Sequence, residues 1–396
     1  MSKIYRAISI LILIVLVSSL VLVGCGDNSG SSALTGPIKI GWTGQLSGPA
    51  SAYGIPGQNE FKMAIDQINA KGGVLGQKLE VIYLDDRGDA TQQMTNVRQL
   101  VEKEGVVFIV GGNSAPAAVL PYLAEQKVPN VFTSAPAEFT DPAKYPYAFG
   151  VLYTTPQVVQ VASEYMVKKL GIKKLGSIAP SSAACKDQEA AAADFVKNAG
   201  GTLVGSEFVN VGDLDMTAQL QKLKAAGAEG LLLWTNVPET PKTLLNMKSM
   251  GWDIPVSGAA GLAAASGVAL AGPDAYKKVY AAWWKSMQYS GSPDNLPQRS
   301  KDFIANLKKT YGDKADFSWA GKMNDQAFVI RTGIERAKST NPDKIKAALE
   351  SAPLTDTVAG KLVYTAKDHS GSPPEELALG MAATNKDGTM QLAPNQ

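Results

Sequence analysis

Residues 113–116, with the sequence Asn-Ser-Ala-Pro, are the segment of this chain best suited to binding an anion. Proline favours the first turn of a helix, and the residues that precede such a turn leave backbone N–H groups free. These amides and the positive end of the helix dipole together attract a carboxylate or phosphate. The hydroxyl of Ser114 is either a further donor to such a ligand or a plain helix N-cap.

The residue patterns of the common hydrolases and nucleotide-binding enzymes are missing from this sequence. It has no G-x-S-x-G, no H-E-x-x-H and no Walker-type loop. The single histidine, His369, stands between Asp368 and Ser370, but the members of a catalytic triad converge in space rather than follow one another. We expect His369 to be a solvated loop residue. We also expect a binding protein that is not an enzyme and has neither a metal ion nor a cofactor.

Cys25 follows a segment with the features of an export signal. Lys3 and Arg6 precede a nearly uninterrupted apolar run over residues 8–23, and small polar residues follow the cysteine. This order is typical of a signal peptide, whereas a transmembrane helix, the alternative, needs about 20 apolar residues. Residues 22–25, Leu-Val-Gly-Cys, resemble a bacterial lipobox. The resemblance implies cleavage after Gly24, lipid on the Cys25 sulfur and a mature protein tethered outside the cytoplasmic membrane.

The composition indicates a well-buried globular protein of two lobes. The chain has 396 residues, of which 45% are hydrophobic and only 19% are charged. Without residues 1–24, basic and acidic side chains are equal in number, so we expect no nucleic-acid partner. If Cys25 carries lipid, Cys185 has no partner for a disulfide and is expected to be a small buried residue.

Short β-branched runs alternate with helical patterns along the chain, and they would place these residues at strand ends. The expected strands are 38–42, 79–84, 106–110 and 130–132 in a first series, and 175–179, 203–209, 231–234, 254–256 and 279–284 in a second. Helical patterns separate them, including 157–170, 187–199, 215–226, 239–250, 300–311 and 324–338. Two such series predict an α/β protein with two parallel-sheet lobes and helices on both faces.

Five stretches in this order resemble the type I periplasmic binding proteins, and specifically their leucine/isoleucine/valine-binding branch. They are residues 38–54, the helix end 65–76, residues 84–86, residues 110–114 and residues 325–327. The resemblance covers about residues 37–395. It implies two Rossmann-like lobes, each a parallel sheet flanked by helices, joined by a hinge of three crossovers.

The resemblance also implies where the domains begin and end. Residues 1–24 would be the lipoprotein signal peptide and residues 25–36 a flexible tether. The first lobe would contain residues 37–155 and 283–375, and the second lobe residues 156–282 and 376–396.

Ligands of open α/β sheets lie beyond the carboxyl ends of the strands, which places the predicted anion-binding turn in the cleft. In the family this turn binds the carboxylate of the ligand, and Ser114 or Ala115 occupies that position here. The second half of the carboxylate site falls at Ser134, Ala135 and Ala137. The family usually has threonine where Ala137 stands, so one hydroxyl is missing.

Further cleft residues are expected from both lobes. Tyr53 matches an aromatic residue of the first lobe, and Trp42 lies near it. Trp234 and Asn236 end a strand of the second lobe. Aromatic rings at these positions either cover an apolar ligand or pack in the core.

The departures from the family concern the ligand's ammonium group. A carboxylate is expected after strand 254–256, but Ala260 stands in that loop, and an expected tyrosine is absent from residues 181–185. No spacing argument selects Glu239, Asp187 or Glu138 as a replacement. A buried ammonium without a counter-charge is costly. The expected ligand is therefore a carboxylate that lacks an α-amino group, or a neutral amide.

The resemblance implies an exported, lipid-anchored solute receptor of an ABC importer. It would capture a small, partly apolar carboxylate or amino-acid-like metabolite by hinge closure and deliver it to permease subunits in the membrane. A ligand-sensing receptor component of the same fold is the alternative. We expect transport, because no second apolar segment follows the signal.

Overall fold

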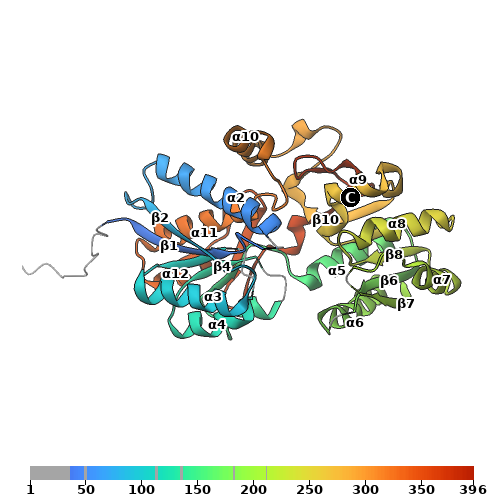
Figure 1. The fold of residues 1–396 in the computed structure, drawn as a ribbon, viewed down its shortest axis with the longest axis horizontal. Helices are drawn as coiled ribbons and strands as arrows, with labels where there is room; N and C mark the ends of the chain where they lie inside the picture. The colour runs from blue at the N-terminus through green and yellow to red at the C-terminus, as the bar shows by residue number, and fades with distance from the viewer. Residues whose placement is uncertain (1–35, 49–50, 112–114, 134–136, 182, 211) are drawn as a thin grey trace, which may run out of the picture. The chain divides into compact units, whose positions relative to one another are not determined.

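The computed structural model is an α/β structure and describes residues 36–48, 51–111, 115–133, 137–181, 183–210 and 212–396 (Figure 1). The predicted signal peptide, Cys25 and nearly all of the tether lie outside these residues. Within the described residues, no helix is both long and apolar enough to span a membrane.

The first sheet has five parallel strands in the order β2-β1-β3-β4-β5. Its strands are β1 (Ile38–Gly44), β2 (Leu79–Asp85), β3 (Phe108–Gly111), β4 (Asn130–Phe132) and β5 (Ala148–Gly150). The connecting helices are α2 (Ser51–Ala70), α3 (Ala90–Arg98) and α4 (Pro116–Glu125). A cluster of Val97, Leu100, Ile109, Val119 and Leu123 packs α3 and α4 against β3. Uniformly apolar β3 fits a parallel strand covered on both faces.

The second sheet has six strands in the order β15-β10-β9-β8-β6-β7, and only β15 runs antiparallel to its neighbour. Its strands are β6 (Lys174–Pro180), β7 (Thr202–Val209), β8 (Gly230–Leu233), β9 (Val256–Gly258), β10 (Val279–Trp284) and β15 (Leu377–Met381). Its helices are α5 (Thr155–Glu164), α6 (Ala183–Asn198), α7 (Thr217–Ala225), α8 (Glu239–Ser249) and α9 (Ala265–Ala271).

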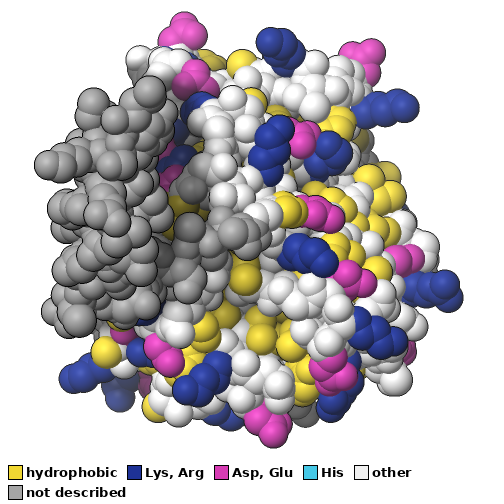
Figure 2. Space-filling model, turned by 90° about the vertical axis from the view of Figure 1, so that its left-hand side faces the viewer, with side chains coloured by type: hydrophobic (Ala, Val, Ile, Leu, Met, Phe, Trp, Pro, Cys, Tyr) yellow, Lys and Arg dark blue, Asp and Glu magenta, His cyan; other side chains and the backbone are white. Residues whose placement is uncertain are grey.

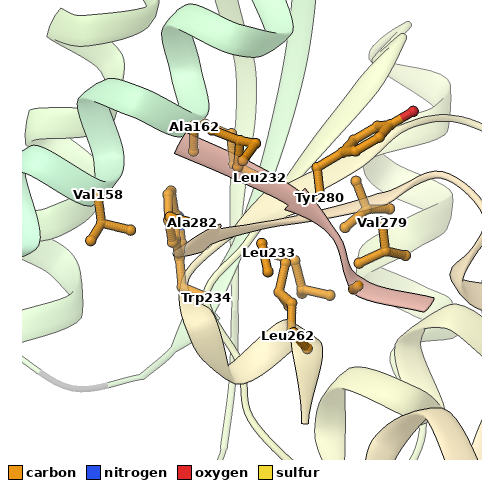
Figure 3. Close-up of a cluster of buried hydrophobic side chains, with 14 of the residues drawn as sticks. Val158, Ala162, Leu232, Leu233, Trp234, Leu262, Val279, Tyr280 and Ala282 are labelled. Carbon is orange, nitrogen blue, oxygen red and sulfur yellow. The ribbon is translucent and has the colours of Figure 1, made fainter. Parts of the chain in front are cut away.

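Apolar side chains fix this second sheet beneath its helices. Leu232 and Leu233 of β8 and Ala282 of β10 lie together with Val158 and Ala162 of α5 (Figure 3). All of them are buried. Because strands and helix share one core, the loops that follow β8 and β9 start from fixed points.

The chain passes between the two sheets three times, after Gly150, after Trp284 and after Gly371. The middle passage leads through β11 (Gln288–Tyr289) and α10 (Gln298–Tyr311) to α11 (Lys322–Ala337) and α12 (Pro342–Glu350). Helix α11 returns to the first sheet, where Gln326 Nε2 donates to the Gly111 and Val131 carbonyls, both at 3.1 Å. A small sheet of β12 (Leu354–Thr357), β13 (Gly360–Thr365) and β14 (Asp368–Gly371) follows, and β16 (Met390–Gln391) pairs with β11.

The two predicted βα series and the α/β class are confirmed. Strand β9 begins at Val256, two residues later than predicted, because Pro255 cannot donate to the ladder. Strands β5 and β15, the small sheet β12–β14 and helices α9 and α12 were not predicted. On the face drawn in Figure 2, Lys and Arg side chains alternate with Asp and Glu over the described residues, in keeping with the balanced composition.

Candidate functional site

A cavity of about 640 Å³ lies beyond the carboxyl ends of β8, β9 and β10. One wall is formed by the loops after β8 and β9, and the other by the segment that leads into α11 together with residues 385–388. The lining residues are Asn236, Val237, Ala260, Gly261, Ala263, Ala264, Ala265, Ser266, Trp283, Ala315, Asp316, Phe317, Ser318, Trp319, Lys322, Asn385, Asp387 and Gly388. The structure thus brings two predicted site residues, Asn236 and Ala260, into one cavity.

The wall on the side of the second sheet is held by close contacts between its two loops. The carbonyl of Asn236 accepts a hydrogen bond from the N–H of Thr240 at 2.7 Å, which fixes the chain at the start of α8. A Cβ atom at Gly261 would collide with Asn236 Oδ1, so a larger residue fits here only if the Asn236 side chain moves. The Asn236 amide is therefore held beside the β9 loop, at the edge of the cavity.

The opposite wall is tied to the second sheet by two hydrogen bonds. Trp283 Nε1 donates to the Gly388 carbonyl at 2.9 Å, and Asn385 Nδ2 donates to the Ala263 carbonyl at 2.7 Å. These bonds join residues more than 100 positions apart in sequence. They hold the apolar face of Trp283 in the cavity wall.

Lys322, the first residue of α11, places a buried cation in this cavity. Only 6% of its surface is exposed. Its Nζ lies 4.1 Å from the ring centroid of Trp284, 5.5 Å from those of Trp283 and Trp319, and 5.7 Å from that of Tyr153. Aromatic faces attract a cation. Among the described residues, no carboxylate lies within ion-pair distance of this ammonium group.

Burial sets the electrostatics around Lys322. It lowers the pKa of Lys322 to about 7, while the carboxyl group of Glu60 opposes that shift. Burial likewise raises the pKa of Glu60 to about 8, although the Gly321 N–H donates to Glu60 Oε1 at 3.4 Å. Both groups therefore change charge near neutral pH. An anionic ligand in the cavity would favour the protonated form of Lys322.

The two carboxylates that line the cavity are differently placed. Asp387 forms an ion pair with Lys308 at 2.6 Å. Asp316 is exposed and accepts a hydrogen bond from the Ser318 N–H at 2.8 Å. The buried ionisable group that lines this cavity is thus the base Lys322, and its protonated form suits an anionic ligand group.

Two predicted aromatic residues lie in the core. Trp42 is fully buried, with its ring 5.7 Å from that of Tyr83. Trp234 is buried as well, and its Nε1 donates to Ser177 Oγ at 3.0 Å, beside the carboxyl of Glu189. Neither ring lines the cavity, which agrees with the alternative that both pack in the core. A ligand contact from either ring stays a prediction.

The predicted carboxylate-binding turn is described only in part. Helix α4 begins at Pro116, as expected, and the Ala115 N–H donates to Gln93 Oε1 at 2.7 Å. A ligand that uses this amide must replace the bond to Gln93. Ser114, Ser134 and Ala135 lie outside the described residues.

Tyr53 and Ala137 are described in their backbone only. Tyr53 belongs to α2, and Ala137 begins the 3₁₀ turn Ala137–Thr140. The roles of both residues at the site stay predictions.

The acids considered as ammonium partners have other roles where they are described. Glu239 is buried and accepts a hydrogen bond from the Gly212 N–H at 2.6 Å. Glu138 is exposed and lies 3.6 Å from Lys144. The side chain of Asp187, like that of Cys185, is not described. None of these three residues lines the cavity.

The expectation that His369 is a solvated loop residue is wrong. It lies in β14, is fully buried and stacks on Phe149 at 4.3 Å. Its Nδ1 is 3.0 Å from the Ala148 carbonyl and its Nε2 is 2.9 Å from Glu350 Oε1. The hairpin β13–β14 packs back against β5 and encloses the ring, which sequence neighbours alone do not reveal. Among the described side chains, no cluster of His, Cys, Asp and Glu could hold a metal ion.

Sequence reasoning missed Lys322 and Trp319. A weak signal exists, because Lys322 precedes a helical pattern that contains the apolar run 327–330 and follows a tryptophan by three residues. A lysine at the start of a buried helix is unusual, since lysine is rarely buried without a partner.

Comparisons with known proteins agree with this architecture. The Leu/Ile/Val-binding protein homolog 3 of Brucella melitensis is 28% identical over 348 residues, which cover 87% of this chain and 91% of that protein. The branched-chain amino acid transporter substrate-binding protein LivJ of Streptococcus pneumoniae, solved with isoleucine, has a TM-score of 0.68 at 20% identity over 90% of this chain and 94% of that one. An ABC-transporter solute-binding protein of R. palustris, solved with 4-hydroxybenzoate, has a TM-score of 0.67 at 23% identity. The match covers 89% of this chain and 95% of that one.

A model of the periplasmic binding protein family matches residues 37–385. This range contains both parallel sheets, the three passages between them and nearly all residues that line the cavity. The chain therefore belongs to the periplasmic binding protein family.

Proposed function

We propose that this protein is the extracytoplasmic solute-binding component of an ABC importer, and that it captures a small, partly apolar carboxylate. The observation that carries the proposal is the cavity at the strand ends, which combines apolar walls with one buried cation. Such a cavity is of the size that small-molecule sites have, and strand ends are where α/β sheets bind ligands. Family membership supports the role in transport.

The protein binds its solute without chemical change. The three passages of the chain form a hinge between the two sheets, and a ligand that touches both walls favours the closed form. X-ray scattering is expected to give a smaller radius of gyration with the true ligand than without it. Chemical turnover of that ligand by pure protein would refute this role.

The mature protein is attached to the outer face of the cytoplasmic membrane by lipid on Cys25, and it delivers its ligand to permease subunits. The basic start, the apolar run and the small residues before Cys25 support this anchoring. Cys25→Ser is expected to remain uncleaved or become soluble. If Cys25→Ser is cleaved and fractionates with the membrane like the wild type, the lipid anchor is refuted.

The ligand lacks an α-amino group. Ala260 stands where the resemblance leads one to expect an acid, Glu239 is already bonded to Gly212, and Asp316 of the cavity wall is exposed to solvent. Relatives of the same fold bind isoleucine in one case and 4-hydroxybenzoate in another, so the fold accommodates both ligand classes. The carboxylate-binding turn at Ser114, Ala115, Ser134 and Ala135 remains part of this proposal.

Calorimetric titration of ligand-free protein tests this proposal, together with mass spectrometry of the solute that native protein releases. We expect 4-hydroxybenzoate or 4-methylpentanoate to bind at least about 100-fold more tightly than leucine, because an unpaired buried charge costs about 3–5 kcal/mol. Micromolar leucine binding without a response to either acid would overturn the ligand class and leave the fold assignment intact.

A further inference from the structure

Lys322 lies in a cavity where no carboxylate of the described residues is within ion-pair distance of its ammonium group. Its side chain is buried, lines the cavity and is contacted by four aromatic rings. A buried cation without an anionic partner is costly, and cation–π contacts offset only part of that cost. Among the described residues, Glu60 is the charged neighbour that acts on it, and it does so from beyond ion-pair distance. The arrangement therefore leaves room for an anion from outside the chain.

The surrounding walls indicate what else that anion must carry. Trp283, Trp319 and Val237 present apolar surface to the same cavity as Lys322. Such walls suit a flat ring or a branched aliphatic chain. Asp316 and Asp387 lie on the cavity wall, and the charge of Asp387 is matched by Lys308. A molecule with an apolar body and one acidic end satisfies both the rings and the ammonium group.

We propose that Lys322 is the anion-binding residue of this cavity, and that its ammonium group pairs with the carboxylate of an aromatic or branched aliphatic acid whose apolar body packs on Trp283 and Trp319. This inference rests on the proposed function and adds the residue that selects acids over amides. The pairing is electrostatic and forms no covalent bond. Lys322 and the predicted turn at Ser114 are alternative partners for the single carboxylate of the ligand, and the experiment below distinguishes them.

The competing role for Lys322 is to neutralise Glu60. Glu60 Oε2 is buried and has no hydrogen-bond partner among the described residues. If Lys322 serves only this carboxyl group, replacing the lysine changes the stability of the protein and leaves ligand selectivity unchanged. The test must therefore compare charged and neutral ligands of the same shape.

The experiment uses the mature chain as Lys322→Met and Lys322→Arg, with Lys346→Met as the matched control. Lys346 is a half-buried lysine of α12 that pairs with Glu350 at 2.9 Å and does not line the cavity. The probes are 4-hydroxybenzoate with 4-hydroxybenzamide, and 4-methylpentanoate with 4-methylpentanamide. Tryptophan fluorescence reports binding, because Trp283 and Trp319 line the cavity.

We expect Lys322→Met to bind at least one of the acids about 100-fold more weakly than the wild type, and both amides within about threefold of it. Lys322→Arg retains the charge, so we expect it to lose less acid affinity than Lys322→Met. We expect Lys346→Met to bind the acids and the amides like the wild type. If wild type and Lys322→Met bind the acids equally well, the inference is overturned and the proposed function stands. The same conclusion follows if Ser114→Ala loses acid binding while Lys322→Met keeps it. Failure of the wild type to bind any acid overturns the proposed ligand class and the inference with it.

A measurement on the wild type keeps the inference testable if Lys322→Met does not fold. Because the pKa of Lys322 is lowered to about 7, the free protein loses this charge as the pH rises. The affinity for 4-methylpentanoate is expected to fall at least about tenfold between pH 7 and pH 9, while that for 4-methylpentanamide stays constant.

Other titratable groups lie near this ammonium group. Glu60 of α2, Tyr153 before α5, and Asp316 and Asp387 of the cavity wall are the nearest, while Asp325 of α11 accepts hydrogen bonds from Val358 and Ala359. The same measurement in Glu60→Gln separates the contribution of Glu60, which also titrates in this range. A pH-independent affinity for the acid in both proteins contradicts the inference.

Discussion

The start of α11 and the hairpin β13–β14 each bury one basic side chain, and they do so in opposite ways. In the hairpin, both ring nitrogens of His369 have hydrogen-bond partners, Ala148 and Glu350, and the ring stacks on Phe149. At the start of α11, Lys322 has aromatic faces around it, and no anion among the described residues lies within ion-pair distance. The first site is complete by itself, while the second faces a cavity.

This difference separates a structural role from a binding role. Buried polar groups in proteins are almost always satisfied, and a satisfied network stabilises one arrangement of the core. His369 fits that description. Lys322 lacks such partners among the described residues, and it lies in the wall of a cavity. A charged group without a partner can there bind a ligand. Variants at both positions should therefore give opposite results for stability and affinity.

The largest expected effect is on the pH dependence of stability at Lys322. Its pKa is lowered from 10.5 in the unfolded chain to about 7 in the folded protein. The charged form is therefore penalised below about pH 7, and the penalty disappears as the pH rises towards 10.5. We expect this group to add about 2–5 kcal/mol to the free energy of unfolding between pH 7 and pH 10. Urea unfolding of wild type and Lys322→Met across this range measures the difference.

Lys322 and Glu60 act on each other's pKa, so the titration of Glu60 does not cancel in that difference, and the same comparison in a Glu60→Gln background isolates the contribution of Lys322. Burial raises the pKa of Glu60 to about 8, so its contribution to stability is lost between about pH 4.5 and pH 8. Parallel curves for wild type and Lys322→Met above pH 7 would show that Lys322 is not a penalised cation, and the contrast with His369 would fail.

The second prediction concerns the histidine. His369→Ala leaves a cavity beside Phe149 and removes the partner of Glu350, at an expected cost of about 3 kcal/mol in the free energy of unfolding. Ligand affinity should stay within about twofold of the wild type, measured by calorimetry with 4-hydroxybenzoate. Lys346→Met is the control, because it removes the other partner of Glu350 and keeps the ring.

The pH dependence of His369 has the sign expected for a base that is buried neutral. Burial lowers the pKa of His369, although Glu350 opposes that shift. Its contribution to stability is therefore present above about pH 6.5 and is lost as the pH falls below that value. His369→Phe should show a smaller loss of stability in acid than the wild type, and an equal loss would contradict this reading.

A third prediction perturbs the cavity wall opposite Lys322. In Gly261→Ala the new Cβ atom collides with Asn236 Oδ1, so the Asn236 side chain or one of the two loops must shift. We expect a cost of about 1–3 kcal/mol in stability and a roughly tenfold loss in affinity for acid and amide alike. A loss confined to the acid would mean that Asn236, rather than Lys322, senses the ligand charge. Gly205→Ala in β7 controls for the loss of glycine, because Gly205 has no positive φ and the added Cβ would meet only the end of the Leu223 side chain.

The smallest effect is expected at Trp283. Trp283→Phe keeps an aromatic ring near Lys322 and loses the hydrogen bond from Nε1 to the Gly388 carbonyl, a cost of about 1 kcal/mol. Trp42→Phe is a matched control, because the buried Nε1 of Trp42 has no hydrogen-bond partner among the described residues. Thermal unfolding of both variants gives the difference. If Trp283→Phe costs no more than Trp42→Phe, the bond to Gly388 does not hold this wall.

Most strands of the two sheets, all except β5 and β15, could be predicted from the sequence because their signal is local. The apolar runs of β3 and β8 and the helical patterns between the strands each indicate their own element. The small sheet β12–β14 could not be predicted in this way, because its short strands mix polar and apolar residues and are fixed by packing against β5. His369 was misplaced for the same reason.

The site could be predicted only where it depends on strand ends. Asn236 and Ala260 follow β8 and β9, and both line the cavity. Trp319 and Lys322 reach the same cavity from the start of α11, and Trp283 of β10 is held in its wall by a hydrogen bond to distant Gly388. A pattern read along the sequence does not reveal such tertiary contacts. A lysine in a helical pattern usually indicates a solvated face.

The return of α11 to the first sheet has a consequence for biogenesis. Strands β1–β5 leave the ribosome early, but α11, whose Gln326 bonds to β3 and β4, follows only after the whole second series. Strand β15, which covers the edge of β10, comes later still. Neither sheet can bury its full core while the chain is incomplete. We therefore expect the nascent polypeptide to remain incompletely folded for most of its synthesis. An unfolded chain is the form that can thread through a translocation channel.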